Sequence, residues 1–109
     1  MARHPDEVEA SGIGTIGEYR LDSSLWTLTH NGTTRRLTAR ESAVLAMLAS
    51  NVGEIVPSER LLKEIWGDDS YYNLRSLNVF ISRLRGYLKD DSRVEIQSLR
   101  GVGYRLILK

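Results

Sequence analysis

Residues 74–89, LRSLNVFISRLRGYLK, decide the fold that this sequence predicts. At helical spacing the apolar residues of the segment form one continuous stripe, made of Leu77, Phe80, Ile81, Leu84, Tyr87 and Leu88. The opposite face collects Arg75, Asn78, Ser82, Arg83, Arg85 and Lys89. No acidic residue occurs between Leu74 and Lys89. The pattern predicts a helix that buries one side and presents a cationic side to solvent.

One apolar residue interrupts the cationic face, because Val79 falls between Arg75 and Arg83. An α-helix fits the major groove of DNA. There, arginine can pair with guanine, asparagine with adenine, and an apolar side chain can contact the thymine methyl group. Arg75, Asn78, Val79 and Arg83 offer all three chemistries. From this segment alone, a solvated amphipathic helix is the alternative, so the rest of the chain must decide.

Length and composition limit the class of protein. A chain of 109 residues fits one domain that can bury a core without disulfides. The absence of cysteine excludes disulfides, thiolate metal sites and a cysteine nucleophile, and it fits a reducing compartment. The apolar run at residues 44–49 is too short to cross a membrane, and the N-terminus lacks the apolar run of a signal peptide. We therefore expect a cytoplasmic protein.

The charge is distributed unevenly along the chain, although its net value is only +1. Residues 1–73 hold seven Lys and Arg against eleven Asp and Glu, a net charge of −4. Residues 74–109 hold eight against three, a net charge of +5. Such a polarised chain favours a polyanionic partner at its C-terminal end.

The N-terminal half predicts a tail followed by a small antiparallel sheet. Residues 1–15 are acidic, and their apolar residues show no helical or strand-like spacing, as in a linker or disordered tail. Strands are expected at residues 16–21, 25–29 and 33–37, separated by turn signals. Asn31 and Gly32 form the strongest of these signals, because Asn-Gly is the preferred pair in a tight hairpin. Arg35 and Arg36 on this sheet are expected to be solvated.

Two helices are expected between the sheet and the basic segment. Thr38 and Glu41 have the spacing of a capping box, which starts a helix at Ala39 that runs to about Val52. Ser58 is the expected cap of the second helix, which stops at Gly67.

A polar loop and a terminal hairpin flank the basic helix. Residues 67–73 form the loop, and Asn73 is the expected cap of the basic helix. After that helix, two alternating strands between Val94 and Leu108 surround a tip at residues 99–103. The glycines at this tip permit positive φ angles and close backbone approach.

The sequence offers no set of residues for catalysis or metal binding. His4 and His30 lack partners at the spacing of metal ligands, and Asp68 with Asp69 supplies too few oxygens to hold a cation. An enzyme would need a nucleophile with a base, paired carboxylates or a metal site. We expect neither an enzyme nor a cofactor.

Taken together, these motifs resemble the OmpR/PhoB winged-helix effector domain of bacterial two-component response regulators, over residues 16–108. The matching residues are Leu37, Thr38, Glu41, Leu61, Leu62, Ile65, Trp66, Gly67, Arg75, Ser76, Val79, Ile81, Arg83, Leu84, Arg85, Arg100, Gly101, Gly103, Tyr104 and Arg105. The resemblance implies an α+β fold over residues 16–109: a winged helix-turn-helix with a four-stranded N-terminal sheet, three helices and a C-terminal β-hairpin wing. The fourth strand would be residues 15–19 or a brief segment near Ile55.

The resemblance also implies roles for individual residues in binding double-stranded DNA. Residues 74–89 would be the recognition helix, in which Arg75, Asn78, Val79 and Arg83 face the bases. The positions that meet the sugar-phosphate backbone would be Trp66, Ser76, Phe80, Arg85, Ser98 and Tyr104. Arg100 would enter the minor groove from the wing. The loop that holds Asp68, Asp69, Ser70, Tyr71 and Tyr72 matches the segment through which such domains can touch RNA polymerase.

Two positions depart from the family pattern. Asn78 stands where aspartate is common, and Gly86 stands where lysine is usual. Asparagine can donate as well as accept hydrogen bonds, which leaves the base preference at Asn78 open. Glycine in a helix interior costs about 1 kcal/mol.

The implied function is sequence-specific DNA binding that controls transcription, on tandem direct repeats and without a membrane partner. Such regulators carry a receiver domain ahead of the effector, and 15 residues cannot contain one. We therefore expect an excised domain that is monomeric when isolated. The alternative is a winged-helix module that binds an acidic protein.

Overall fold

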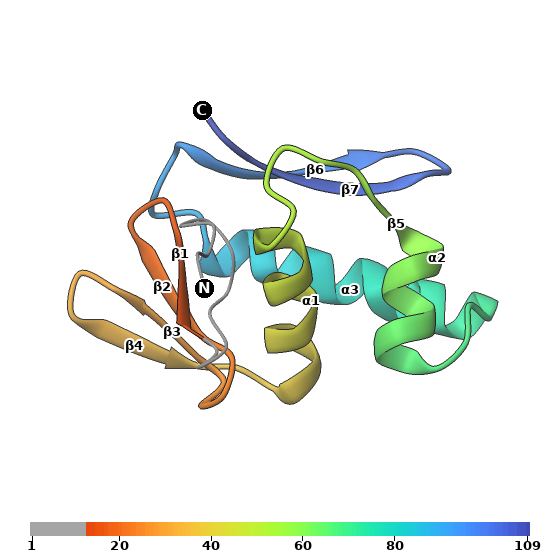
Figure 1. Ribbon diagram of the computed structural model, residues 1–109, viewed down its shortest axis with the longest axis horizontal. Helices are drawn as coiled ribbons and strands as arrows, with labels where there is room; N and C mark the ends of the chain where they lie inside the picture. The colour runs from red at the N-terminus through yellow and green to blue at the C-terminus, as the bar shows by residue number, and fades with distance from the viewer. Residues whose placement is uncertain (1–12) are drawn as a thin grey trace, which may run out of the picture.

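The computed structural model describes residues 13–109, which form two antiparallel sheets around three helical segments (Figure 1). The first sheet has the order β1-β2-β3-β4, with strands at Ile13–Ile16, Tyr19–Asp22, Thr27–His30 and Thr33–Arg36. The second has the order β5-β7-β6, with strands at Val56–Pro57, Gly103–Leu108 and Val94–Leu99. The α+β winged-helix architecture implied by the resemblance is confirmed.

The helical segments follow the N-terminal sheet, and β5 of the second sheet lies between α1 and α2 in the chain. They are α1 at Ala39–Ala49, α2 at Ser58–Leu61, which continues as the π-helix η1 at Leu62–Trp66, and α3 at Tyr71–Tyr87. In Figure 1, α3 runs from the α2 end of the molecule toward the N-terminal sheet, while the hairpin of β6 and β7 crosses the top. The helix-turn-helix is therefore α2 with η1, a short turn, and α3.

The N-terminal sheet has four strands, one more than the residue pattern indicated. The predicted single strand at residues 16–21 is wrong, because the chain reverses at Gly17, whose φ is +58°. Ile16 then pairs with Tyr19 across a tight turn. The brief strand near Ile55 also exists, as β5, but it belongs to the second sheet. Of the predicted tail at residues 1–15, residues 1–12 lie outside the described residues and the rest belong to β1.

The first helix begins as predicted and ends three residues early. The capping box is confirmed: Thr38 N donates to Glu41 Oε1 at 2.8 Å, and Glu41 N donates to Thr38 Oγ1 at 3.1 Å. At the other end, the side chains of Ser50 and Asn51 donate to main-chain carbonyl groups of the last turns. Such side chain to backbone bonds compete with continuation of the helix. The helix therefore stops at Ala49.

Two of the predicted helix caps are wrong. Pro57, not Ser58, occupies the cap position of α2, and no side chain caps it. At α3 the cap is Ser70, whose Oγ accepts from Asn73 N at 3.3 Å. The Asn73 carboxamide instead donates to the carbonyl and the carboxylate of Asp68, at 3.2 and 2.8 Å. As a result, α3 begins at Tyr71, three residues before the expected start.

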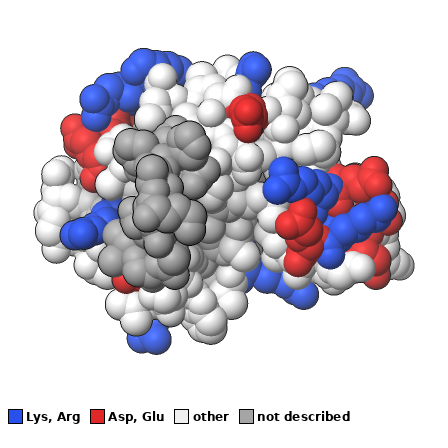
Figure 2. Space-filling model, viewed as in Figure 1, with Lys and Arg blue, Asp and Glu red and all other residues white. Residues whose placement is uncertain are grey.

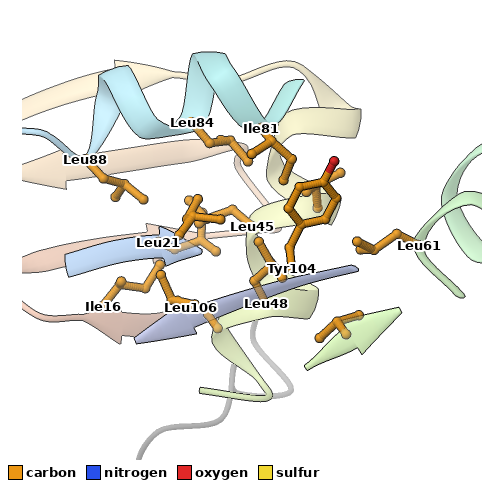
Figure 3. Close-up of a cluster of buried hydrophobic side chains, with 14 of the residues drawn as sticks. Ile16, Leu21, Leu45, Leu48, Leu61, Ile81, Leu84, Leu88, Tyr104 and Leu106 are labelled. Atoms are coloured by element: carbon orange, nitrogen blue, oxygen red, sulfur yellow. The ribbon is translucent and has the colours of Figure 1, made fainter. Parts of the chain in front are cut away.

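The buried face of α3 closes a single core (Figure 3). Leu77, Ile81 and Leu84 are almost fully buried. In Figure 3, Ile81 and Leu84 point from α3 toward Leu45 of α1 and toward the strands. The strands contribute Ile16, Leu21 and Leu106 to the same cluster. This packing fixes which face of α3 remains at the surface.

Asp91 links the N-terminal sheet to the start of the hairpin and is 5% exposed. Its Oδ2 accepts from Glu18 N at 3.0 Å, and its Oδ1 accepts from Arg93 N at 3.0 Å. The Arg93 guanidinium binds both carboxylate oxygens at 3.2 Å. These bonds, chiefly those from Arg93 and Glu18, lower the pKa of Asp91 from 3.8 to about 2.

The Asp91 carboxylate predicts an acid sensitivity of the fold. Because its pKa is lower in the folded chain, the stabilisation is complete above pH 4 and is lost as the pH falls toward 2. Asp91→Asn should lower the free energy of unfolding at pH 7 and flatten its decline between pH 4 and 2. Urea unfolding at a series of pH values measures both effects. Asp90→Asn, the same change on an exposed neighbour, is the control, and equal behaviour of the two variants would contradict this role.

Candidate nucleic-acid interface

The two-faced character predicted for α3 is confirmed. Opposite the buried stripe, Arg75, Asn78, Val79 and Arg83 are all exposed. Val79 is 50% exposed, which is unusual for a branched apolar side chain. No Asp or Glu belongs to α3. The exposed face therefore combines arginine, a carboxamide and one apolar group.

The wing projects beside this face and carries Arg100 at its tip. Arg100 is exposed, and within residues 13–109 it has no hydrogen bond or ion pair. The neighbouring Gly101 turns the chain with a φ of +75°. Gly103 instead allows close approach, because a Cβ there would lie 2.1 Å from the carbonyl oxygen of Val56. That contact is the pairing of β5 with β7, which holds the base of the wing.

A groove of about 610 Å³ separates α3 from the wing. Leu74 and Asn78 line it from α3, residues 98–104 line it from the hairpin, and residues 57–59 line it from the start of α2. Helix α3 and the wing are therefore two distinct projections on one side of the core.

Arg85 and Ser98, which the sequence predicts as two separate phosphate contacts, are in contact with each other. The Arg85 guanidinium donates to the Ile96 carbonyl from Nε at 3.0 Å and from Nη2 at 2.8 Å. Nη2 also donates to Ser98 Oγ at 2.7 Å. Arg85 thus joins the exposed side of α3 to β6.

Tyr104, another predicted phosphate contact, points at a predicted base contact. It is 6% exposed, and its hydroxyl donates to Asn78 Oδ1. Burial raises the pKa of Tyr104, so the hydroxyl remains protonated at neutral pH. In the chain without DNA, this hydroxyl is therefore bound to Asn78.

Arg83 contacts Phe80, a predicted backbone contact, and Glu41, which the sequence did not associate with the site. Its Nη1 lies 3.9 Å from Glu41 Oε2, and its guanidinium lies 5.2 Å above the Phe80 ring. Glu41 is buried, and its Oε2 also accepts from the Tyr87 hydroxyl at 2.9 Å. The capping box was visible in the sequence, but nothing in its spacing placed Glu41 beside Arg83.

Trp66, Phe80 and Ser76, three of the predicted backbone contacts, are partly buried. The rings of Trp66 and Phe80 meet edge to face, with centroids 5.3 Å apart, and the Arg40 guanidinium lies 5.0 Å above the indole ring. The indole N–H is closed to solvent and has no partner among the residues described. In this conformation Trp66 packs rather than donates.

The predicted polymerase-contact segment is exposed but is only partly a loop. Asp68, Asp69 and Ser70 form the turn before α3, whereas Tyr71 and Tyr72 belong to its first turn. The tyrosines are 70% and 82% exposed. The backbone N–H of Ser70 is the main cause that holds the pKa of Asp68 below its usual value.

The α2 end of the molecule carries charge of both signs (Figure 2). Figure 2 shows basic and acidic side chains interleaved at the right of the view. Arg60 pairs with Glu64 at 2.9 Å and Lys63 with Glu59 at 2.8 Å. These charges neutralise one another locally, whereas Arg75 and Arg100 have no ion pair among residues 13–109.

Residues 13–109 contain no group of three or more His, Cys, Asp or Glu side chains that could hold a metal ion. Among these residues no helix is long and apolar enough to span a membrane.

Several transcription regulators are similar to the chain in sequence. It is 39% identical over 97 residues to the transcriptional regulatory protein RprY of Bacteroides fragilis, covering 89% of this chain and 41% of RprY. It is 32% identical over 102 residues to the transcriptional regulatory protein AfsQ1 of Streptomyces coelicolor, covering 92% of this chain and 45% of AfsQ1. The chain thus spans less than half the length of these curated relatives.

Solved structures show the same fold. The DNA-binding domain of CpxR from E. coli superimposes with a TM-score of 0.78 at 27% identity, over 88% of this chain and 96% of that one. The RstA DNA-binding domain of Klebsiella pneumoniae was solved in complex with the RstA box. It superimposes with a TM-score of 0.72 at 28% identity, over 87% of this chain and 96% of that one. The family model described as "Transcriptional regulatory protein, C terminal" matches residues 32–106. The chain belongs to this family, the OmpR/PhoB-type winged-helix DNA-binding domains of transcription regulators.

Proposed function

We propose that this chain binds duplex DNA sequence-specifically, with α3 in the major groove and the wing in the adjacent minor groove. The observation that carries the proposal is the exposed face of α3, where arginines, Asn78 and Val79 stand without any acidic residue. Phosphates attract such a surface regardless of sequence, whereas base edges distinguish its hydrogen-bonding and apolar groups. The fold leaves this face free because the opposite face of α3 fills the core.

Individual roles follow from chemistry and position. Val79 is proposed to contact a thymine methyl group, and Arg83 and Arg75 to pair with guanine. Arg100 suits a narrow minor groove, where the negative potential is enhanced. Ser76, Phe80 and Trp66 flank the base-reading face, a position that suits contacts to the sugar-phosphate backbone.

The two reading elements are held in a fixed relation before DNA arrives. Arg85 ties α3 to β6 through the Ile96 carbonyl, and the close approach of Gly103 to Val56 ties β7 to β5. Little conformational freedom would then be lost when both elements contact DNA, which favours affinity.

The biological setting is also a proposal. The similarity to transcriptional regulatory proteins at less than half their length supports an effector domain that is joined to a receiver domain and controls transcription in the cytoplasm. The exposed residues of the turn before α3 and its first helical turn, Asp68 to Tyr72, would be available to RNA polymerase. In isolation, this DNA-binding domain should be monomeric and bind tandem direct repeats with one copy per half-site.

The base-reading role of Arg83 can be tested with an arginine of equal exposure as control. Arg83→Ala should cost about 1–3 kcal/mol on a duplex selected by the wild-type chain, and relax specificity at one position. The side chains of Arg83 and Arg60 are both 50% exposed, so Arg60→Ala removes an equal charge outside the proposed interface. Fluorescence anisotropy on selected and scrambled duplexes measures the difference. An equal loss on both duplexes would show that Arg83 contacts only phosphate.

The same titrations, repeated over a range of salt concentrations, separate DNA binding from the alternative of an acidic protein partner. Phosphate neutralisation predicts that the logarithm of the binding constant falls linearly with the logarithm of salt concentration. Failure to bind any duplex at low salt would favour the protein partner instead.

The proposed role of the wing is tested by changing the DNA sequence on either side of the binding site. Arg100→Ala should weaken binding most on duplexes with A·T-rich flanks, because the narrow minor groove there attracts arginine. Binding constants on A·T-rich and G·C-rich flanks around one core site provide the comparison. If both sets weaken equally, Arg100 only neutralises a phosphate.

The link between α3 and the hairpin is tested by Arg85→Ala. Removing the three hydrogen bonds should lower the free energy of unfolding by about 1–3 kcal/mol, and should also weaken binding to the selected duplex. Arg105→Ala is the matched control, because Arg105 donates to Gln97 within the hairpin at 2.9 Å and makes no link to α3. Urea unfolding and anisotropy measure the two effects. A variant as stable as the wild-type chain would contradict the linking role.

A further inference from the structure

The buried Tyr104 side chain meets the exposed reading face at one residue, Asn78. Tyr104 lies on β7, and in Figure 3 its hydroxyl points toward α3. That hydroxyl donates to Asn78 Oδ1 at the wall of the groove between α3 and the wing. Among the residues described, the Tyr104 hydroxyl has no other hydrogen-bond partner. The carboxamide of the exposed Asn78 is therefore held at its Oδ1 by a buried tyrosine.

The anchor matters because a carboxamide has two chemically different ends. Oδ1 accepts hydrogen bonds, whereas Nδ2 donates two of them. A reversed carboxamide would present Nδ2 to the tyrosine oxygen and leave the hydroxyl hydrogen without an acceptor in a largely buried position. Unpaired buried donors are disfavoured. The hydroxyl thus selects the orientation in which Nδ2 is the free end.

We propose that Tyr104 is a positioning residue for base readout, which holds Asn78 Oδ1 so that Asn78 reads DNA as a hydrogen-bond donor. This inference deepens the proposed function and rests on it. Pairing of asparagine with adenine uses both ends of the carboxamide. With Oδ1 held by Tyr104, the free Nδ2 best matches guanine, which offers two adjacent acceptors, O6 and N7, in the major groove. Cytosine, which presents a donor there, is disfavoured.

The test is selection of binding sites from random duplexes by three chains: wild type, Tyr104→Phe and Asn78→Asp. The wild-type chain should prefer guanine over adenine at one position by roughly fivefold or more, the low end of what a good base contact gives. Asn78→Asp keeps an acceptor for Tyr104 but presents a second acceptor to DNA, so the same position should change to cytosine. Tyr104→Phe frees Oδ1, and the guanine preference there should fall to near parity with adenine while other positions are unchanged.

Tyr19→Phe serves as the matched control. Tyr19 is also a buried tyrosine, and its hydroxyl accepts from Asp90 N at 3.0 Å on the other side of the core. This variant loses one buried hydroxyl hydrogen bond as Tyr104→Phe does, yet it should retain the wild-type preference at every position. Thermal unfolding of both variants confirms that each is folded at the temperature of selection.

The outcomes separate this inference from the function on which it rests. If Tyr104→Phe binds all sequences less tightly by one common factor and keeps the guanine preference, Tyr104 has no role in readout and the inference is overturned. A preference of the wild-type chain for adenine at the position that Asn78→Asp alters would overturn it as well. A wild-type chain that selects no sequence at all would instead overturn the proposed function.

Discussion

The burial of one face of α3 is the constraint on which the rest of the structure depends. Leu77, Ile81 and Leu84 are at most 1% exposed, and each such side chain contributes about 1.5–3 kcal/mol when it leaves water. Rotation of α3 by one residue would bring polar side chains into the core. The orientation of the helix is thus fixed by packing, and the surface position of Asn78, Val79 and Arg83 follows from it.

A second set of contacts sets the wing relative to the helix, and these contacts involve the backbone. Arg85 binds the Ile96 carbonyl, and Gly103 lies so close to Val56 that no side chain would fit. A surface for DNA must match the spacing of two neighbouring grooves. In this fold the distance between α3 and the wing depends on Arg85 and Gly103, which are not among the side chains proposed to read the bases.

Local signals in the sequence predicted much of the fold. The period of α3, the capping box at Thr38 and the hairpin around Arg100 each depend on residues close together in the chain. The reversal at Gly17 and the cap at Ser70 were missed, because neighbouring residues offered equally good strand and cap signals. The pairs Arg85 with Ser98 and Tyr104 with Asn78 are 13 and 26 residues apart. Only tertiary packing brings such pairs together, so spacing could not reveal that three predicted phosphate contacts bind within the chain.

The most direct test of the reading surface is an NMR titration of the ¹⁵N-labelled chain with the selected duplex at physiological salt. If α3 and the wing read DNA, the largest amide shift changes should fall on the exposed residues of α3 and around Arg100. The strands β1 to β4 should change little, because they lie at the opposite end of the molecule from the tip of the wing (Figure 1). Dominant changes in that sheet, or changes spread evenly over the surface, would contradict the assignment of the interface to α3 and the wing.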